Sequence, residues 1–154
     1  MPTNNEASIT VLIADDHCLA REGVRSILSA APDIKIVGEA EEGCQIKQKV
    51  ADLRPKILLL DIYMANLLPA ELEKWVRTNH PETNILVLTG HHRKSHLSNM
   101  LLTQMMDAGV SGYLEKSLRS EQLISAIRRA ARGERLFSEA QIEKARRWRD
   151  EISW

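Results

Sequence analysis

Short apolar runs alternate with longer segments of helical periodicity along this chain. Five runs rich in Val, Ile and Leu lie at residues 9–14, 34–40, 57–60, 85–89 and 112–115. The middle runs are nearly continuous in branched apolar residues, which is typical of strands buried on both faces. An alternation of such strands with helices predicts an α/β fold with a parallel sheet flanked by helices.

The segments between these runs carry apolar residues at the spacing of a helix face. The five predicted helices are marked by Leu19, Val24, Ile27 and Leu28, by Ile46, Val50 and Leu53, by Leu68, Leu72, Trp75 and Val76, by Leu97, Leu101 and Met105, and by Leu123, Ile124, Ile127 and Ala131. Ser120 is the expected N-cap of the fifth helix, and Gly133 follows its end. Farther on, Ser138 and Gln141 have the spacing of a capping box, so we expect a sixth, polar helix over Glu139–Ile152.

The length of 154 residues and the hydrophobic content of 44% suit one globular domain with a short extension. We expect a flexible leader at residues 1–8, the folded domain at 9–133 and a linker helix at 134–154. The polar start and the lack of an apolar stretch of about 18 residues argue against a signal region or a membrane span, so a cytoplasmic protein is expected. Cys18 and Cys44 lack metal-ligand spacing, which predicts two reduced, mostly buried thiols.

Lys and Arg number 21 and Asp and Glu number 21, so the net charge is zero. This balance argues against a surface that is basic throughout, as a nonspecific binder of nucleic acid or anionic lipid would have. The charge is nevertheless uneven, because residues 128–149 hold eight Arg or Lys against three Glu. The composition is therefore compatible only with a local contact to a polyanion.

Polar residues lie at the ends of four of the five predicted strands. Asp15 and Asp16 follow the first strand, Asp61 follows the third, Thr89 ends the fourth and Lys116 follows the fifth. In an open parallel sheet the carboxyl ends of the strands meet at one edge, where ligands bind. We therefore expect these five residues to converge.

Three carboxylates at one edge repel each other, and each raises the pKa of its neighbours unless a cation intervenes. Magnesium binds oxygen ligands and typically joins one or two carboxylates to a phosphate, which makes Asp15, Asp16 and Asp61 a candidate Mg2+ site. Lys116 can pair with Asp61 or with a phosphoryl group, and the Thr89 hydroxyl can donate to the same group. Each residue alone also has an ordinary structural explanation, such as helix capping by Asp16 or a surface position for Lys116.

Several ordered motifs extend this pattern across the chain. They are Val11-Leu12-Ile13-Ala14-Asp15-Asp16-His17, Arg21-Glu22-Gly23-Val24-Arg25, Pro32-Asp33-Ile34 with Val37-Gly38-Glu39-Ala40, Leu60-Asp61-Ile62-Tyr63-Met64, Leu86 to Thr89, and Ala108-Gly109-Val110-Ser111-Gly112-Tyr113-Leu114-Glu115-Lys116. With these motifs, residues 9–133 resemble the receiver domain of two-component response regulators, specifically the NarL/FixJ (LuxR-type) branch of transcription regulators. The resemblance implies a flavodoxin-like (βα)5 doubly wound parallel sheet of order 2-1-3-4-5.

By this resemblance Asp61 accepts a phosphoryl group from a sensor histidine kinase or a small phosphodonor. Asp15, Asp16, Asp61 and the backbone carbonyl of Tyr63 hold Mg2+ in the implied site. The physical argument agrees, because attack by a carboxylate on phosphorus requires neutralised charge and a positioned nucleophile rather than elaborate acid–base chemistry. The implied domain is regulatory and not an enzyme, apart from catalysing its own phosphorylation and dephosphorylation.

The resemblance also implies how the phosphoryl group changes the domain. Lys116 and Thr89 bind the phosphoryl oxygens, Thr89 shifts toward the group, and the ring of Tyr113 turns inward. These movements remodel the face made by the fourth helix, the fifth strand and the fifth helix. About two units of added negative charge bias this two-state element.

Among the departures from the pattern of the branch, two concern the loops near Asp61 and Thr89. Met64 is followed by Ala65 where Pro is usual, which leaves the geometry of the loop after Asp61 open and makes a looser loop one outcome. The segment Thr89–Gly109 is a few residues longer than usual and contains His91 close to its start. We expect His91 to act as a modulator, so that His91→Ala changes the lifetime of phosphorylated Asp61.

A further module is expected beyond this chain, because regulators of the NarL/FixJ type continue through a linker into a helix-turn-helix domain. The chain carries no match to that module, so DNA binding is expected only through the absent C-terminal domain. We favour a receiver with its linker, cut from a longer protein, over a natural single-domain receiver. Trp148 and Trp154 in the extension predict packing on the receiver or on a second copy, which would give a homodimer.

Two alternatives remain open from the sequence. One is a phosphorylation-independent (atypical) receiver that acts by protein contact, which the departures after Met64 keep open. The other is a haloacid-dehalogenase-type phosphohydrolase, a family that also places an Asp nucleophile after an apolar strand and uses Mg2+. That family predicts a second acid two residues after the nucleophile, where this chain has Tyr63.

Overall fold

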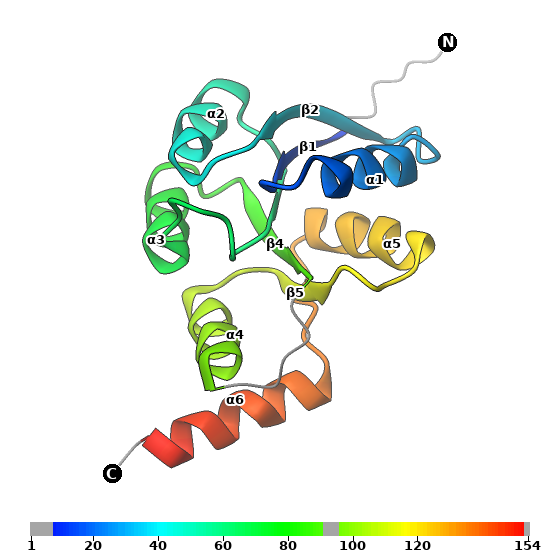
Figure 1. Ribbon diagram of the computed structural model, residues 1–154. Coiled ribbons are helices and arrows are strands. Elements are labelled where there is room, and N and C mark those ends of the chain that lie inside the picture. The colour runs from blue at the N-terminus through cyan, green and yellow to red at the C-terminus, as the bar shows by residue number, and fades with distance from the viewer. Residues whose placement is uncertain (1–7, 91–95, 153–154) are drawn as a thin grey trace.

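A single parallel sheet organises the computed structural model, which describes residues 8–90 and 96–152 (Figure 1). Its five strands are paired in the order β2-β1-β3-β4-β5, and every pair is parallel. The strands are β1 (Ile9–Ala14), β2 (Ile34–Ala40), β3 (Ile57–Leu60), β4 (Asn84–Thr89) and β5 (Gly112–Glu115). The flavodoxin-like order that the family resemblance implied is therefore confirmed, and β4 begins one residue earlier than its apolar run.

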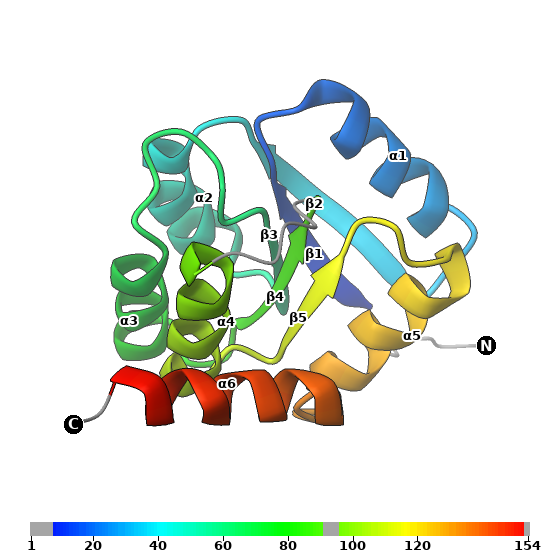
Figure 2. The same cartoon turned by 60° about the horizontal axis from the view of Figure 1, so that its bottom comes forward.

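Helices cover both faces of the sheet (Figure 2). One face carries α1 (Cys18–Leu28) and α5 (Ser120–Ala131), and the other carries α2 (Ile46–Leu53), α3 (Pro69–Asn79) and α4 (His96–Ala108), with a short 3-10 turn at Gly43–Gln45 before α2. The expected N-cap of α5 is wrong by one residue. Ser120 is already helical, and the backbone N–H of Arg119 donates to Oε1 of Gln122 at 2.7 Å.

Two apolar cores fill the space between the sheet and its helices. Successive strand residues point to opposite faces, so Leu12 of β1 packs with α2 and α3 while Val11 packs with α1 and α5. The same alternation places Leu58 in the first core and Leu59 in the second. A strand that is buried on both sides has no solvent-facing position, which is why β3 consists of apolar residues alone.

Both cysteines are free and exposed, so the expectation of mostly buried thiols is wrong. The Cys18 thiol lies 3.5 Å from Oε2 of Glu22, and the Cys44 thiol lies 3.5 Å from Oε1 of Glu42. The physical reason is that neither cysteine shares the apolar stripe of its segment. α1 buries Val24 instead, and Cys44 lies in the short turn before α2.

The predicted sixth helix is α6 (Glu139–Ile152). It begins with the expected capping box, because the Ser138 N–H donates to Oε1 of Gln141 and the Gln141 N–H donates to Oγ of Ser138, both at 3.1 Å. Its polar side pairs charges within the helix, such as Arg147 with Glu143 at 3.0 Å. None of the helices within the described ranges has the length and apolar character that a membrane crossing requires.

α6 packs along α4 rather than projecting away from the domain (Figures 1 and 2). Ala145 is fully buried, and Arg149 forms an ion pair with Asp107 of α4. Nε2 of Gln141 donates to the backbone oxygen of Tyr113 in β5 at 2.6 Å. The extension is therefore bound to the two elements at the far edge of the sheet.

Replacing Ala145 by Asp is expected to detach α6 while leaving the sheet intact. A carboxylate at this fully buried position has to regain water, and undocking of one peripheral helix is the smallest opening that allows it. Hydrogen exchange should show α6 amides exchanging at least about tenfold faster, with β1 and β3 unchanged. Ala140→Asp, at an exposed position of the same helix, is the control. Equal protection in both variants would contradict the packing described.

Candidate functional site

The carboxyl ends of β1 and β3 bring the predicted acidic residues to one edge of the sheet. Ala14 pairs with Leu60 in the parallel register, so the residues that follow these strands emerge side by side. The Asp61 N–H donates to the backbone oxygen of Ala14 at 3.0 Å, and the Asp15 N–H donates to that of Ala40 at 3.1 Å. The main chain thus places both carboxylates before any side-chain contact is considered.

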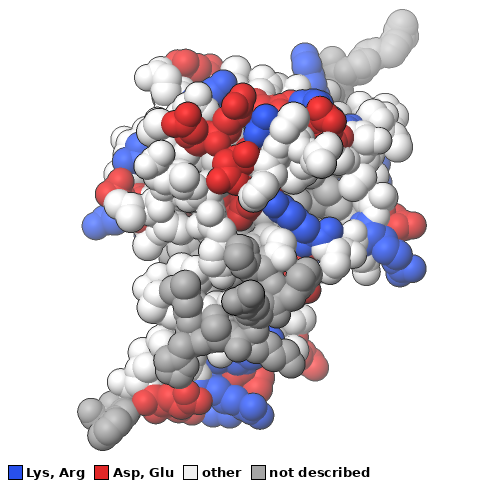
Figure 3. All heavy atoms as spheres, in the orientation of Figure 1, with Lys and Arg blue, Asp and Glu red and all other residues white. Residues whose placement is uncertain are grey.

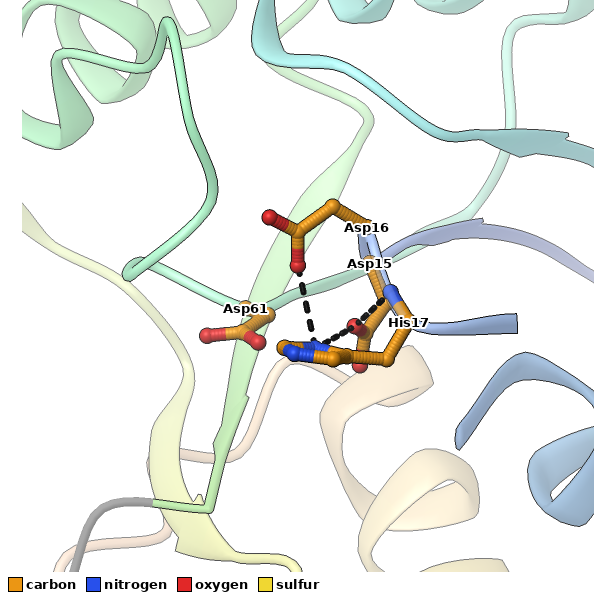
Figure 4. Close-up of side chains that lie close together, drawn as sticks. All are labelled: Asp15, Asp16, His17 and Asp61. Atoms are coloured by element: carbon orange, nitrogen blue, oxygen red, sulfur yellow. Dashed lines mark hydrogen bonds and ion pairs between the residues drawn. The ribbon is translucent and has the colours of Figure 1, made fainter. Parts of the chain in front are cut away.

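Asp15, Asp16 and Asp61 converge as predicted, and His17 joins them (Figure 4). One ligand atom of each of these four residues lies within 4.8 Å of the others. Asp15 and Asp61 are each 5% exposed, whereas Asp16 is exposed. In the space-filling view, acidic side chains gather in the upper half of this face, near the carboxyl ends of β1 and β2 (Figure 3).

His17 is a member of this cluster that the sequence reasoning did not single out. Its Nδ1 lies 3.2 Å from Oδ1 of Asp15 and 3.0 Å from Oδ1 of Asp16, and its backbone N–H donates to Oδ1 of Asp15 at 2.9 Å (Figure 4). The imidazole is exposed on its outer side. The position of His17 directly after Asp15 and Asp16 is the sequence feature that could have indicated its place in the cluster. The direction of its side chain, however, depends on where α1 starts.

Lys116 supplies the positive charge of the site. Its Nζ lies 2.6 Å from Oδ2 of Asp15 and 3.2 Å from Oδ2 of Asp61. Burial of the ammonium lowers its pKa, but the hydrogen bond to Asp15 and the charge of Asp61 outweigh this effect, so the pKa of Lys116 is raised. One cation therefore bridges two buried carboxylates.

Thr89 lies at the same edge and is 1% exposed. It is the last residue of β4, and its backbone oxygen accepts a hydrogen bond from the Lys116 N–H at 2.8 Å. The β4–β5 register therefore brings both residues to the same edge of the sheet, where the Lys116 side chain contacts the acidic cluster. His91, the predicted modulator, lies outside the described residues, and so do most of the residues between Thr89 and α4.

Tyr63 and Tyr113 lie beside the site on the α4 side. The Tyr63 N–H donates to Oδ1 of Asp61 at 2.9 Å, which orients that carboxylate. The Tyr63 hydroxyl is 3.5 Å from Oγ of Ser98 in α4. Burial raises the pKa of the half-buried Tyr113 phenol, and the neighbouring Tyr63 and Asp61 add to the shift. Tyr63 thus links Asp61 to α4, and Tyr113 is its neighbour.

Hydrogen bonds tie down the loop after Asp61, where the branch pattern has Pro and this chain has Ala65. The Ala65 N–H donates to Oδ2 of Asp16 at 3.5 Å, and its backbone oxygen accepts from the Gly43 N–H at 3.2 Å. Met64 beside it is buried. The structure therefore gives this loop hydrogen-bonding partners where the branch pattern has the rigidity of Pro.

The residues present fit a magnesium ion. Mg2+ prefers carboxylate and carbonyl oxygens and retains several waters, and the cluster offers oxygen atoms from three carboxylates, one of them exposed to water. Two of the three are buried and share a single compensating ammonium, so the cluster carries excess negative charge. Asp15, Asp16 and Asp61 are the side chains that could hold the ion.

Fold and site together define a class of protein, a doubly wound α/β domain with a cluster of acidic side chains at the carboxyl ends of its strands. The family model of the response regulator receiver domain matches residues 11–128. The chain belongs to the family of response regulator receiver domains.

Two named relatives show which response regulators this chain is similar to. The transcriptional regulatory protein DegU of Brevibacillus brevis is 34% identical over 129 residues, which cover 84% of this chain and 52% of DegU. The response regulator protein VraR of Staphylococcus aureus strain Mu3 is 31% identical over 139 residues, which cover 90% of this chain and 64% of VraR. The chain thus spans about half the length of DegU and less than two thirds of VraR.

A solved structure supports the same assignment. The signal receiver domain of the putative response regulator NarL from Mycobacterium tuberculosis has a TM-score of 0.74 with this chain at 28% identity. The match covers 82% of this chain and 98% of that domain. The resemblance to the NarL/FixJ (LuxR-type) branch, first drawn from the motifs, is confirmed.

Proposed function

We propose that this protein is a phosphorylation-activated receiver of a two-component system that controls transcription. Asp61 is the phosphoacceptor, and a sensor histidine kinase is the donor. The single observation that carries the proposal is the environment of Asp61. Its buried carboxylate faces the Lys116 ammonium at 3.2 Å, and Asp15 and Asp16 lie in the same cluster.

Phosphoryl transfer requires a positioned nucleophile and neutralised charge. The Tyr63 N–H holds Oδ1 of Asp61, which leaves Oδ2, on the Lys116 side, to form the new bond to phosphorus while the bond from phosphorus to the donor nitrogen breaks. Asp15, Asp16, Asp61 and the backbone carbonyl of Tyr63 would hold Mg2+, which supplies neutralising charge for the phosphoryl oxygens.

Lys116 and Thr89 then bind the phosphoryl oxygens in this proposal. The Lys116 ammonium already lies between Asp15 and Asp61, and Thr89 is joined to Lys116 through the backbone. About two units of new negative charge on Asp61 bias the positions of Thr89 and Tyr113, which are the switch residues. Tyr113 connects the site to α6, because its backbone oxygen accepts a hydrogen bond from Gln141.

The rest of the regulator follows the domain division expected from the sequence. In this proposal residues 1–8 are a leader, 9–133 are the receiver, and 134–154 are a linker that contains α6 and leads toward a C-terminal helix-turn-helix domain, through which alone the full protein binds DNA. The similarity to DegU, a transcriptional regulatory protein, supports this assignment. A homodimer and a cytoplasmic location belong to the same proposal.

Incubation with acetyl phosphate and Mg2+, followed by intact mass measurement, tests the proposal. We expect the wild-type chain to gain one phosphoryl group, and Asp61→Asn to gain none, since the amide is no nucleophile toward phosphorus. Beryllofluoride with Mg2+ should shift the NMR signals of the wild type and not those of the variant. A wild type that shows no Mg2+-dependent response would instead support the phosphorylation-independent receiver. Turnover of many phosphoesters would support the phosphohydrolase.

A further inference from the structure

A buried arginine lies directly behind the acidic cluster. Arg21 belongs to α1, yet its side chain is only 11% exposed and reaches the carboxyl end of β1. Its Nη1 donates to the backbone oxygen of Asp15 at 2.7 Å, and its Nε donates to Oε1 of Glu39 at 2.9 Å. Its Nη2 lies 3.8 Å from Oε2 of Glu41. The guanidinium therefore joins α1, β1 and β2 behind the site.

The location of Arg21 on α1 is unusual for a charged residue. It shares the inward face of the helix with Val24 and Leu28, one and two turns further on. A buried guanidinium is costly unless it is paired and its donors are satisfied. Glu39 provides the pairing, because the β1–β2 register places it beside Ile13, close to the end of the strand.

The Asp15 carbonyl oxygen lies beyond the end of β1, and its hydrogen-bond donor is Arg21 rather than a neighbouring strand. β1 ends at Ala14, and the Asp15 N–H still bonds to β2 through the backbone oxygen of Ala40. Nη1 of Arg21 donates to the Asp15 carbonyl oxygen instead. Both polar groups of the Asp15 main chain are thus held, while its carboxylate faces Lys116 and His17.

We propose that Arg21 is a positioning residue that fixes the main chain of Asp15 and thereby sets the affinity of the acidic cluster for Mg2+. Glu39 holds the guanidinium in the orientation that reaches the Asp15 carbonyl. The inference rests on the proposed function, because it takes Asp15 as a ligand of the ion. Partners that orient a metal ligand typically change metal affinity tenfold to a hundredfold when they are removed.

The direction in which Mg2+ affinity changes when Arg21 is replaced distinguishes the positioning role from two simpler roles of this residue. A cation close to a metal site repels the ion, so electrostatics alone predicts tighter Mg2+ binding when the charge of Arg21 is removed. A role confined to stability predicts unchanged affinity in the molecules that remain folded. Positioning predicts weaker binding.

The test is a Mg2+ titration of the full chain, followed by the NMR signals of the backbone amides of Asp15, Asp16 and Asp61. We expect Arg21→Met to weaken Mg2+ binding at least about tenfold. Arg21→Lys keeps the positive charge and a hydrogen-bond donor, but an ammonium lacks the planar guanidinium that contacts Asp15 and Glu39 at once. Its Mg2+ affinity should therefore lie between those of Arg21→Met and the wild type. Glu39→Gln should weaken Mg2+ binding less than Arg21→Met does, and it serves as the second variant if Arg21→Met does not fold.

Two matched controls accompany the titration. Val24→Ala destabilises the same helix at a buried position without touching Asp15, and it should leave Mg2+ affinity unchanged. Arg25→Gln removes the other arginine that pairs with Glu39, again without contact to Asp15. Thermal unfolding in EDTA measures the stability of each variant, so that affinity and stability are read separately.

The outcomes distinguish this inference from the function on which it rests. A wild type that binds Mg2+ and takes up a phosphoryl group, together with Arg21→Met that binds Mg2+ as tightly or more tightly, overturns the role of Arg21 alone. A wild type without saturable Mg2+ binding overturns both. Weaker binding by Arg21→Met, partial recovery by Arg21→Lys and unchanged binding by Val24→Ala support the positioning role.

Discussion

Replacing Lys116 by Met is expected to lower the free energy of unfolding by about 3 kcal/mol in Mg2+-free solution. The reason is that Asp15 and Asp61 would remain buried next to each other without the ammonium that bridges them at 2.6 and 3.2 Å. Removing one partner of a buried ion pair costs more than the pair itself contributes, because it leaves uncompensated charge. Phosphoryl uptake from acetyl phosphate should be lost as well.

Urea unfolding in EDTA and in saturating Mg2+ measures this effect. Mg2+ should restore more stability to Lys116→Met than it adds to the wild type, because the ion provides the positive charge that the variant lacks. Lys47→Met, which removes the exposed ion pair with Glu71, is the control and should change stability by less than about 1 kcal/mol. Equal unfolding curves for wild type and Lys116→Met in EDTA would contradict the charge bridge.

The same ion pair predicts a pH dependence. The pKa of Lys116 is raised in the folded state above its ordinary value of 10.5. A raised lysine pKa contributes stability that is complete below 10.5 and is lost as the pH rises through the higher folded value. The stability difference between wild type and Lys116→Met should therefore shrink in that range. Tyr113, whose pKa burial also raises, titrates in both proteins, so the difference isolates Lys116.

Replacing Gly43 by Ala is expected to destabilise the protein by about 2 kcal/mol and to slow phosphoryl uptake. A Cβ at this position would lie 2.1 Å from the backbone oxygen of Asn66 and 2.8 Å from the backbone nitrogen of Leu67. Backbone atoms cannot move aside as a flexible side chain can, so the loop after Asp61 has to shift. The hydrogen bond between Gly43 and Ala65 would be displaced with it.

Gly23→Ala is the matched control for this substitution. Gly23 lies in the middle of α1, and a Cβ there meets nothing within 4 Å. Alanine is favoured over glycine in a helix interior, so this variant should be more stable by up to about 1 kcal/mol. Thermal unfolding and the rate of phosphoryl uptake measure both variants. A stabilising Gly43→Ala, or the same sign for both substitutions, would contradict the close contact between the two loops.

The strands and the acidic edge were predictable from the sequence for a physical reason. A strand that is buried on both faces has to be apolar along its whole length, so β1 and β3 are visible as apolar runs. Parallel strands that are joined by helices end at the same edge, so the residues after them converge whatever the details of packing. This is why the sequence alone predicts that Asp15, Asp61 and Lys116 lie close together.

Contacts that depend on the rotation of a helix were not predictable in the same way. Arg21 stands four residues from His17, and only the docking of α1 on the sheet directs its guanidinium to the Asp15 carbonyl. The exposure of Cys18 follows from the same rotation. A helical pattern identifies which face of the helix is apolar. It does not show which groups the terminal atoms of a long polar side chain at the border of that face contact.

The sequence by itself determined the five strands, the convergence of the acidic residues and the existence of α6, and its resemblance to the receiver family implied the strand order. The tertiary structure alone decided that α6 lies against α4, that Gln141 reaches the Tyr113 carbonyl, and that His17 and Arg21 enclose Asp15 from two sides. The physical reason is the separation along the chain of the residues involved. Periodicity and strand ends are local properties of the chain, whereas these contacts join elements whose relative positions are set by the packing of both cores.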